Sequence, residues 1–221
     1  KKNGEKIKVI PTEETAIKND FVNSLVSDEN SLFYLNTYGS LYSISKKGQI
    51  KWFTNLNRSL DINPNSLFYS SPLVLHQNKL IISTDLHLYI LNSNNGSIFS
   101  KIAITSLFRP FISGKNLFLI TKDDLLVCIN LDSKKIVYSL DISKNIANYL
   151  DTKKKTISIQ SSAIINNDIF LFLDNSYLVK FSSLGKIKEI SKLPSKLSSF
   201  PIFINESIIY LNNKNKLVLV N

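Results

Sequence analysis

Few side chains of this chain have the types and the spacing that chemistry requires. The two histidines are His76 and His87, and Cys128 is the single cysteine. A metal site needs more ligands than two separated histidines, and no CxxC pair accompanies them. The sequence has no G-x-S-x-G nucleophile motif and no glycine-rich phosphate loop, although spacing alone leaves a Ser–His–Asp triad open. We interpret the histidines as turn or strand-edge residues and Cys128 as a small buried hydrophobe.

Charge is the second chemical feature. The formal net charge is +10, and nearly all of the positive charge comes from lysine because Arg58 and Arg109 are the only arginines. Such a balance suits an anionic partner, whether a nucleic acid, a membrane surface or an acidic protein. The lysines are spread along the chain, and the densest cluster is Lys153–Lys155, near Tyr149. Scattered lysines at strand edges and turns also prevent aggregation, so we favour that interpretation and expect no nucleic-acid partner.

A repeat supplies the elements that position these residues. Five segments share one pattern: a lead-in with serine or proline, an apolar strand, a polar turn, a second strand, another turn and a third strand. The period is about 40 residues, which is typical of a β-propeller. The segments are 24–44, 71–91, 109–129, 162–181 and 200–220.

Each repeat is predicted to form a four-stranded antiparallel blade, with strands A to D in chain order. The strands are rich in Val, Ile, Phe and Tyr, which favour pleated and half-buried positions. The fifth repeat has no strand D, and residues 1–10 resemble the C–D turn and strand D of the other repeats. We therefore expect an all-β propeller whose last blade is completed by the N-terminal strand, because such closure removes an unpaired edge.

We expect residues 1–221 to form a single propeller domain. The five repeats fit a closed five-bladed ring, and they fit equally well the C-terminal part of a larger propeller. The chain contains no methionine, so we expect that further residues precede Lys1. No apolar run is long enough to cross a bilayer.

Two connections between blades are long. They comprise residues 55–70 and 142–159, and the second is predicted to contain a short helical turn over 144–150. Because strand direction alternates, D–A connections and B–C turns open on one face of a propeller, and long loops on a rigid scaffold are where binding residues collect. Arg and Tyr are common interface anchors. The predicted partner-binding residues are Arg58, Tyr69, Phe108, Arg109 and Tyr149.

The repeat resembles that of PQQ-type β-propellers. The resemblance rests on SLFYLNTYGSLYSISKKGQIKWF (31–53) and SSPLVLHQNKLIISTDLHLYILNSNNGSIF (70–99), and it extends over nearly the whole chain. Within that superfamily the chain is similar to the BamB family of outer-membrane assembly lipoproteins. This resemblance implies a non-enzymatic protein-binding scaffold at the periplasmic face of the bacterial outer membrane. It implies a barrel-assembly component as partner and a lipid anchor outside this chain.

The chain departs from that family at one position of its repeat. PQQ-type repeats carry a tryptophan late in strand D that docks against the neighbouring blade. Here only Trp52 holds that place. The equivalent residues of the other strands D are Lys8, Ser100, Tyr138 and Glu189.

The sequence leaves two other functions open. A PQQ-dependent or other small-ligand enzyme would need a calcium ion held by carboxylate and amide oxygens, with an aspartate as base. The candidate pair Asp123–Asp124 lies in a B–C turn, where aspartate is expected for conformational reasons. We therefore expect no catalytic activity, cofactor or metal, since a fold does not imply its best-known activity. The remaining alternative is a basic module that binds an anionic partner.

Overall fold

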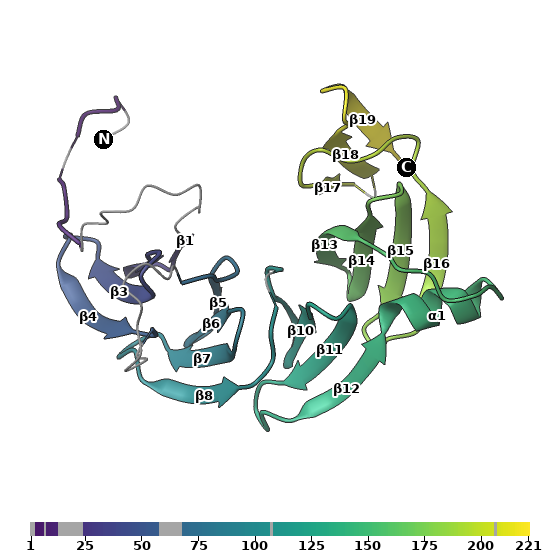
Figure 1. The fold of residues 1–221 in the computed structure, drawn as a ribbon. Coiled ribbons are helices and arrows are strands. Elements are labelled where there is room, and N and C mark those ends of the chain that lie inside the picture. The colour runs from purple at the N-terminus through teal and green to yellow at the C-terminus, as the bar shows by residue number, and fades with distance from the viewer. Residues whose placement is uncertain (1–2, 7, 13–23, 58–67, 107, 206) are drawn as a thin grey trace. The chain divides into compact units, whose positions relative to one another are not determined.

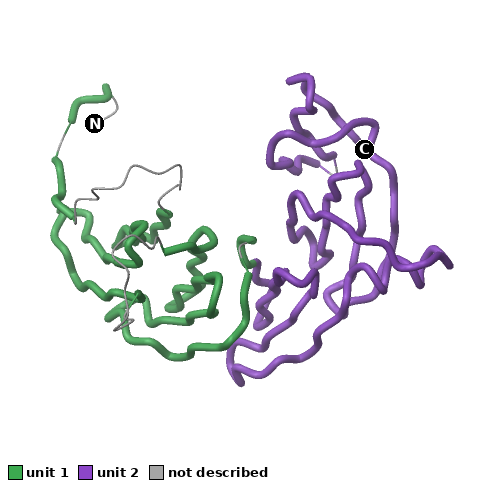
Figure 2. The backbone as a smooth tube through the Cα atoms, viewed as in Figure 1, with its two compact units in different colours: residues 1–110 green, residues 111–221 purple. Residues whose placement is uncertain are grey.

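Antiparallel sheets make up most of the described part of the chain. The structure, a computed structural model, describes residues 3–6, 8–12, 24–57, 68–106, 108–205 and 207–221. The residues fall into two units, unit 1 (residues 1–110) and unit 2 (residues 111–221), shown in Figure 2. Within each unit, every sheet is a meander in which consecutive strands pair. We number the sheets blade 1 to blade 5 in chain order.

Unit 1 contains two four-stranded blades (Figure 1). Blade 1 consists of β1 (Ser24–Ser27), β2 (Ser31–Leu35), β3 (Ser40–Ser45) and β4 (Ile50–Asn55). Blade 2 consists of β5 (Val74–His76), β6 (Lys79–Ser83), β7 (Leu88–Asn92) and β8 (Ile98–Ile102).

Unit 2 contains two four-stranded blades and one three-stranded blade. Blade 3 consists of β9 (Phe111–Ser113), β10 (Asn116–Ile120), β11 (Leu125–Asn130) and β12 (Ile136–Asp141), and it is followed by α1 (Ile142–Tyr149). Blade 4 consists of β13 (Ile159–Ile165), β14 (Asp168–Leu173), β15 (Tyr177–Ser182) and β16 (Ile187–Lys192). Blade 5 consists of β17 (Ile202–Ile204), β18 (Ser207–Leu211) and β19 (Leu217–Val220).

The five predicted repeats therefore each form a sheet, in the predicted strand order. Blade 5 differs from the prediction in one respect. It has three strands, and the described N-terminal residues, 3–6 and 8–12, form no strand. Completion of this blade by an N-terminal strand is thus not seen. Lys8 instead contacts blade 1, where its Nζ donates a hydrogen bond to the Gly48 carbonyl oxygen (3.2 Å).

The cores lie between neighbouring blades. Side chains alternate between the two faces of a strand, so the middle strands of a blade can bury apolar residues on both sides. One cluster joins blades 1 and 2 through Phe33, Leu35 and Leu41 on one side and Leu80 and Ile82 on the other. A second cluster joins blade 4 to blade 5. It contains Phe172, Leu178, Ile208 and Tyr210.

A side chain of strand D closes the seam between blades 1 and 2. The ring of Trp52 packs on the C–D turn of blade 2, and its Nε1 donates a hydrogen bond to the Ser93 carbonyl oxygen (3.0 Å). A Cβ atom at Gly96 would lie 2.6 Å from Trp52 Cε3, and Gly96 has a φ of +73°. Glycine is therefore required there both for its conformation and for the close approach of the ring.

The seam between blades 3 and 4 has the same form. Tyr138 Oη donates a hydrogen bond to the Ser183 carbonyl oxygen (3.0 Å), and a Cβ atom at Gly185 would lie 2.5 Å from Leu140 Cδ2 and 3.1 Å from Tyr138 Cε2. Tyr138 thus occupies the docking position that Trp52 occupies in unit 1.

Helix α1 confirms the helical turn predicted within residues 142–159. Asp141 is its N-cap, with extended backbone and a side chain that accepts a hydrogen bond from the Lys144 amide (2.8 Å). This bond satisfies an amide that the first helical turn leaves unpaired. The helix buries Ile142, Ser143 and Ala147 and presents Tyr149 to solvent. No helix in the described ranges is long and apolar enough to cross a membrane.

Candidate interaction site

The connection that leaves blade 1 folds back onto the B–C turn of the same blade. The Leu56 amide donates a hydrogen bond to the Gly39 carbonyl (2.8 Å), and the Phe68 amide donates to the Thr37 carbonyl (2.9 Å). A Cβ atom at Gly39 would lie 2.9 Å from Asn57 Cβ and from Phe68 Cδ2. In unit 1, the D–A connection and the B–C turn therefore lie on the same face, as the strand alternation predicted.

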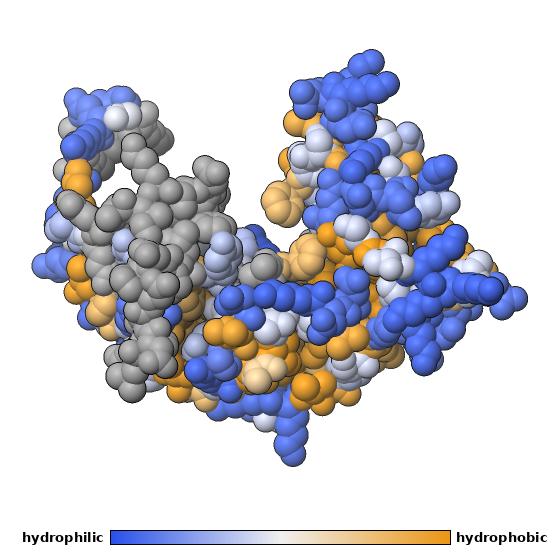
Figure 3. Space-filling model, in the orientation of Figure 1, coloured by the Kyte–Doolittle hydropathy of each residue, from blue (hydrophilic) through white to orange (hydrophobic). Residues whose placement is uncertain are grey.

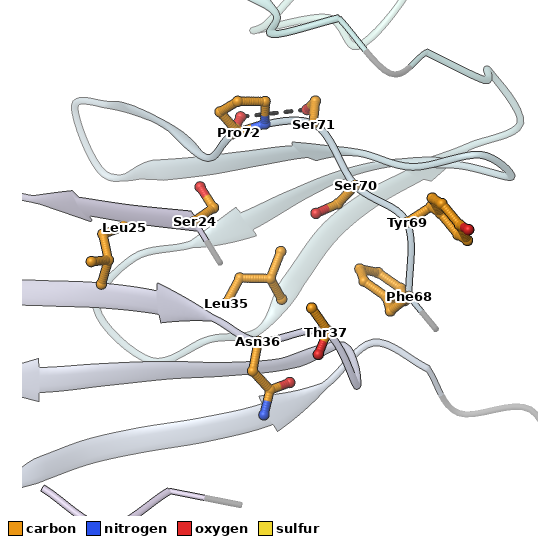
Figure 4. A pocket seen from close by; sticks show the side chains of 10 residues that line it. All are labelled: Ser24, Leu25, Leu35, Asn36, Thr37, Phe68, Tyr69, Ser70, Ser71 and Pro72. Carbon is orange, nitrogen blue, oxygen red and sulfur yellow. Dashed lines mark hydrogen bonds between the residues drawn. The ribbon is translucent and has the colours of Figure 1, made fainter. Parts of the chain in front are cut away.

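A groove of about 370 Å³ opens beside this contact (Figure 4). Its lining combines apolar side chains with hydroxyl and amide groups. Figure 4 shows Phe68 pointing toward Leu35 and Tyr69 pointing away from it. Phe68 packs against the core cluster of blades 1 and 2, whereas Tyr69 is 43% exposed. The lining residues are Ser24, Leu25, Leu35, Asn36, Thr37, Phe68, Tyr69, Ser70, Ser71 and Pro72.

Backbone amides fix the polar side chains of the groove. Ser24 Oγ accepts a hydrogen bond from the Leu73 amide (2.6 Å), and Asn36 Oδ1 accepts from the amides of Tyr38 (3.0 Å) and Ser40 (2.9 Å). Apart from the Tyr69 phenol, no lining residue is titratable. The described lining of the groove therefore contains hydroxyl, amide and apolar groups and no carboxylate, histidine or lysine. Its surface is suited to contact and hydrogen bonding.

The connection that leaves blade 3 makes the corresponding contact in unit 2. The Ile142 amide donates a hydrogen bond to the Asp124 carbonyl in the B–C turn (3.1 Å). A pocket of about 380 Å³ opens there, and its lining is charged. Figure 3 shows hydrophilic side chains gathered over α1 and the residues that follow it. The lining residues are Asp123, Asp124, Asp141, Ser143, Lys154, Lys155 and Thr156.

The charges of this pocket oppose one another. The side-chain hydrogen bond from Lys154 and the backbone hydrogen bond from Lys144 hold the pKa of Asp141 below its ordinary value. Burial raises the pKa of Asp124, and the neighbouring charges of Asp141 and Asp123 raise it further, against the influence of Lys154. Lys154 and Lys155 of the lysine cluster and the Asp123–Asp124 pair, which are far apart in the sequence, therefore line one pocket.

The next question is whether this pocket could hold the calcium ion that a PQQ-dependent enzyme needs. The carboxylate of Asp141 is occupied by Lys154 and the α1 N-terminus. Among the described residues, no group of three or more His, Cys, Asp or Glu side chains could hold a metal ion. The residues around the Asp123–Asp124 pair therefore do not fit a calcium–quinone centre.

The structure describes four of the five predicted contact residues. Tyr69 lines the groove, whereas Arg58 lies outside the described residues. Phe108 is half-buried and Arg109 is exposed, and neither lines a pocket described above. Tyr149 lies in α1, is 50% exposed and donates a long hydrogen bond from Oη to the Lys188 carbonyl (3.4 Å). Partner contact through any of the five residues stays a prediction.

Sequence reasoning did not single out the other residues of the groove. Leu35, Asn36 and Thr37 belong to the end of β2 and the B–C turn, and Phe68 to the connection. The Ser70–Pro72 lead-in was recognised as part of the repeat but not as a lining segment. The available signal was the length of the 55–70 connection, which placed binding residues near its end.

Cys128 is buried, whereas both histidines are half-buried. Burial raises the pKa of the Cys128 thiol to about 11, so the thiol stays protonated at neutral pH. Burial lowers the pKa of His87, and Lys101 lowers it further against an opposing effect of Asp85. His76 lies half-buried in β5. Neither histidine lines the groove or the charged pocket.

Solved structures with the same architecture are numerous, although sequence comparisons give nothing. No protein-family model and no curated protein sequence matches the chain. BamB from Moraxella catarrhalis aligns with a TM-score of 0.54 at 9% identity, over 88% of this chain and 68% of that one. The computationally designed Ika8 protein aligns with a TM-score of 0.61 at 12% identity, over 88% and 56%. The WD40 β-propeller domain of Doa1 aligns with a TM-score of 0.57 at 10% identity, over 89% and 62%.

These similarities show the fold. The chain has an all-β propeller architecture, and its described residues form five blades, as the repeat predicted. It spans less than two thirds of the length of the Ika8 and Doa1 chains. The identities of 9–12% carry no assignment of activity or partner.

Proposed function

We propose that this protein is a non-enzymatic protein-interaction scaffold and that the groove of unit 1 is part of its docking surface. The observation that carries the proposal is the lining of the groove. Its described residues join an exposed aromatic ring to apolar and hydroxyl-bearing side chains, and none of them is charged. Tyrosine with an apolar body and a polar tip is a common anchor of protein interfaces.

The rigid backing of the groove supports this role. Gly39 and Phe68 hold the connection against the B–C turn, so the backbone that carries Tyr69 is ordered before a partner arrives. A preorganised surface loses less conformational entropy on binding. A loop or extended segment of a partner protein would place an apolar side chain beside Phe68 and a hydrogen-bonding group beside Ser70.

The finer proposal is that the partner belongs to an outer-membrane barrel-assembly machinery. It is supported by the PQQ-type repeat pattern of residues 31–53 and 70–99 and by the fold that the chain shares with BamB. Under this proposal the chain works as one propeller domain at the periplasmic face of the outer membrane. Attachment to the membrane would come from an anchor outside the 221 residues.

The test is the affinity of the chain for a purified barrel-assembly component. Tyr69→Ala should weaken binding by about tenfold or more, as expected for an anchor worth at least about 1.4 kcal/mol. The matched control is Tyr177→Ala, because Tyr177 is 37% exposed and lies outside the groove. Equal affinity of both variants and the wild type would show that the groove does not bind the partner.

Two further measurements address the alternative functions. A rise in melting temperature on addition of PQQ and calcium would indicate a small-ligand site, since a ligand that binds the native state stabilises it. Binding to polyanions that falls steeply with salt would indicate a basic binding module. Either result without binding to a barrel-assembly component would contradict the proposed scaffold role.

A further inference from the structure

The C–D turn of blade 2 contains one of the two Asn–Gly pairs of the sequence. The pairs are Asn95–Gly96 and Asn3–Gly4. An asparagine that precedes glycine can modify itself, because a residue without a Cβ atom lets its backbone nitrogen reach the side-chain carbonyl carbon of the asparagine. Asn95 is exposed, whereas Gly96 is buried where the Trp52 ring closes the seam. The turn therefore places a reactive pair directly beneath a packing contact of unit 1.

The side-chain carbonyl of Asn95 is held in an activating environment. Its Oδ1 accepts hydrogen bonds from the Ser97 amide (3.0 Å) and from Ser97 Oγ (2.8 Å). Donors on a carbonyl oxygen stabilise the negative charge that develops there when a nucleophile attacks the carbon. At the other pair, Asn3 Oδ1 accepts a longer hydrogen bond, from the Glu5 amide (3.4 Å). Asn95 thus has the more activated carbonyl of the two.

The attacking atom of the same pair is shielded. The Gly96 amide donates a hydrogen bond to the Asn92 carbonyl oxygen (2.8 Å), and an added Cβ atom at Gly96 would lie 2.6 Å from the Trp52 ring. The nitrogen must lose its proton to a base before it can attack, and a buried, hydrogen-bonded amide meets base only when the structure opens locally. Nothing lies within 4 Å of an added Cβ atom at Gly4. The shielding of Gly96 therefore comes from the closed seam.

We propose that Asn95 is a site of self-modification that Ser97 activates and the Trp52 seam controls. When the seam opens, a base removes the Gly96 amide proton and the nitrogen bonds to Asn95 Cγ. The bond from Cγ to the side-chain nitrogen then breaks, and that nitrogen takes up a proton and leaves as ammonia. Water opens the resulting five-membered imide at either carbonyl, so the products are aspartate and isoaspartate. No oxidant or reductant is needed.

The isoaspartate product conflicts with the closed seam. Its main chain runs through Cβ and Cγ, which adds a methylene group to the backbone immediately before Gly96. The native turn is closed by the hydrogen bond from Gly96 to Asn92, with a φ of +73° at Gly96 beneath the indole. The longer backbone displaces Gly96 from that position. The aspartate product keeps the native backbone and an oxygen that accepts the Ser97 hydrogen bonds, so only isoaspartate would hold the seam open.

Peptide mapping by mass spectrometry, with digestion at low pH, measures both asparagines in one sample of the full chain. In the folded wild type at mildly alkaline pH, Asn95 should react about tenfold more slowly than Asn3 or slower still, because only the opened seam exposes Gly96. In denaturing urea the two rates should become similar. A folded protein in which Asn95 reacts as fast as Asn3 would overturn the proposal.

Trp52→Phe tests control by the seam. The substitution keeps a ring over Gly96 but removes the hydrogen bond from Nε1 to the Ser93 carbonyl. The rate at Asn95 should rise roughly fivefold, as expected from the loss of one hydrogen bond, and the rate at Asn3 should not change. The matched control is Tyr138→Phe, which removes the corresponding bond in unit 2 and should leave Asn95 at the wild-type rate.

Two outcomes of this comparison would contradict control by the seam. An unchanged rate at Asn95 in Trp52→Phe would show that the seam does not limit the reaction. Equal acceleration by Trp52→Phe and Tyr138→Phe would show that unfolding of the whole chain limits it. Hydrogen exchange at the Gly96 amide measures the opening in each variant independently of the modification.

Ser97→Ala tests the activation of the carbonyl. It removes the Oγ donor and keeps the amide donor, so the rate at Asn95 in the Trp52→Phe background should fall roughly tenfold after correction for Gly96 exchange. An unchanged corrected rate would contradict a role for Ser97. Asn95→Gln should abolish the reaction at this site on the same timescale, because attack on its longer side chain must close a six-membered ring.

The consequence is tested on the isoaspartate form, separated from the unmodified protein by ion exchange. Amides of residues 93–97 should exchange about tenfold faster in this form than in the wild type, whereas Asn95→Asp should keep the wild-type exchange. Wild-type exchange in the isoaspartate form would show that the seam closes again and would overturn its role in holding the seam open. The inference does not depend on the docking groove, and none of these substitutions touches Tyr69.

Discussion

Unit 1 and unit 2 use the same two devices with different side chains. In each, an aromatic residue of strand D seals a seam against a glycine of the next C–D turn: Trp52 against Gly96, and Tyr138 against Gly185. In each, a D–A connection is bonded to the B–C turn of its own blade. The glycine contact and the backbone hydrogen bond are common to both units, whereas the aromatic residue and the side chains of the connection differ.

This difference shows that the residues of the D–A connections can change while their attachment to the blade stays the same. The described lining of the groove beside the blade 1 connection carries no charged residue. The connection of blade 3 begins with a capped helix and borders a pocket that contains both aspartates and lysines. Both connections rest on the same hydrogen-bonded position of the blade. The repeat thus fixes the place of a loop, and the loop residues alone decide its chemistry.

The seams give the largest expected effect. Gly96→Ala would place a Cβ atom 2.6 Å from the ring of Trp52 at a φ of +73°, so backbone strain and steric overlap both apply. We expect a loss of roughly 2–5 kcal/mol in the free energy of unfolding. Gly185→Ala should cost less, because its closest contact is the end of the Leu140 side chain, which can move.

Gly114→Ala is the control for backbone strain alone. Gly114 has a φ of +56°, and nothing lies within 4 Å of the added Cβ atom. Urea denaturation followed by circular dichroism should rank the three variants with Gly96→Ala least stable and Gly114→Ala most stable. Equal losses at all three glycines would mean that the seams contribute nothing beyond their turn geometry.

Tyr138→Phe should have an intermediate effect. The substitution keeps the ring on Gly185 but removes the hydrogen bond from Oη to the Ser183 carbonyl, which should cost about 1 kcal/mol. Tyr138→Trp would convert the seam of unit 2 to the chemistry of unit 1. If the phenylalanine variant melted like the wild type, the analogy between the hydrogen bonds of the two seams would fail.

The smallest expected effects come from the charged pocket and depend on pH. The pKa of Asp141 is lowered in the folded state, so its charge stabilises the protein above the unfolded value of 3.8, and this contribution is lost as pH falls through the folded value. The pKa of Asp124 is raised, so its ionisation costs stability as pH rises through the folded value. Asp141→Asn should lower the melting temperature at neutral pH, and Asp124→Asn should leave it unchanged or raise it.

In acid, where the carboxylates are protonated, each variant should melt at the same temperature as the wild type. Melting curves between pH 2.5 and pH 7 measure this, and asparagine at position 141 keeps the capacity to cap α1. If both variants melted at a lower temperature than the wild type at neutral pH, the two carboxylates would not have opposite effects on stability.

Much of the fold was predictable because the same pattern of strands and turns occurs five times in the sequence. Alternating Val, Ile, Phe and Tyr segments with polar turns predicted the strands, and residues 144–150 were expected to be helical where α1 spans 142–149. The meeting of Asp124 with Lys154 was not predictable, since about thirty residues separate them and only the fold brings them together. The packing role of Tyr138, which matches that of Trp52, was likewise not predictable, because it depends on a glycine in the next blade.

Trp52 gives unit 1 an optical label that unit 2 lacks. It is the only tryptophan among the 221 residues, and its indole lies in the seam of unit 1, hydrogen-bonded to Ser93. Indole emission will therefore report the opening of that seam, while far-ultraviolet dichroism reports the strands of both units. Comparing the two signals during unfolding separates a molecule that melts as a whole from one whose halves melt in turn.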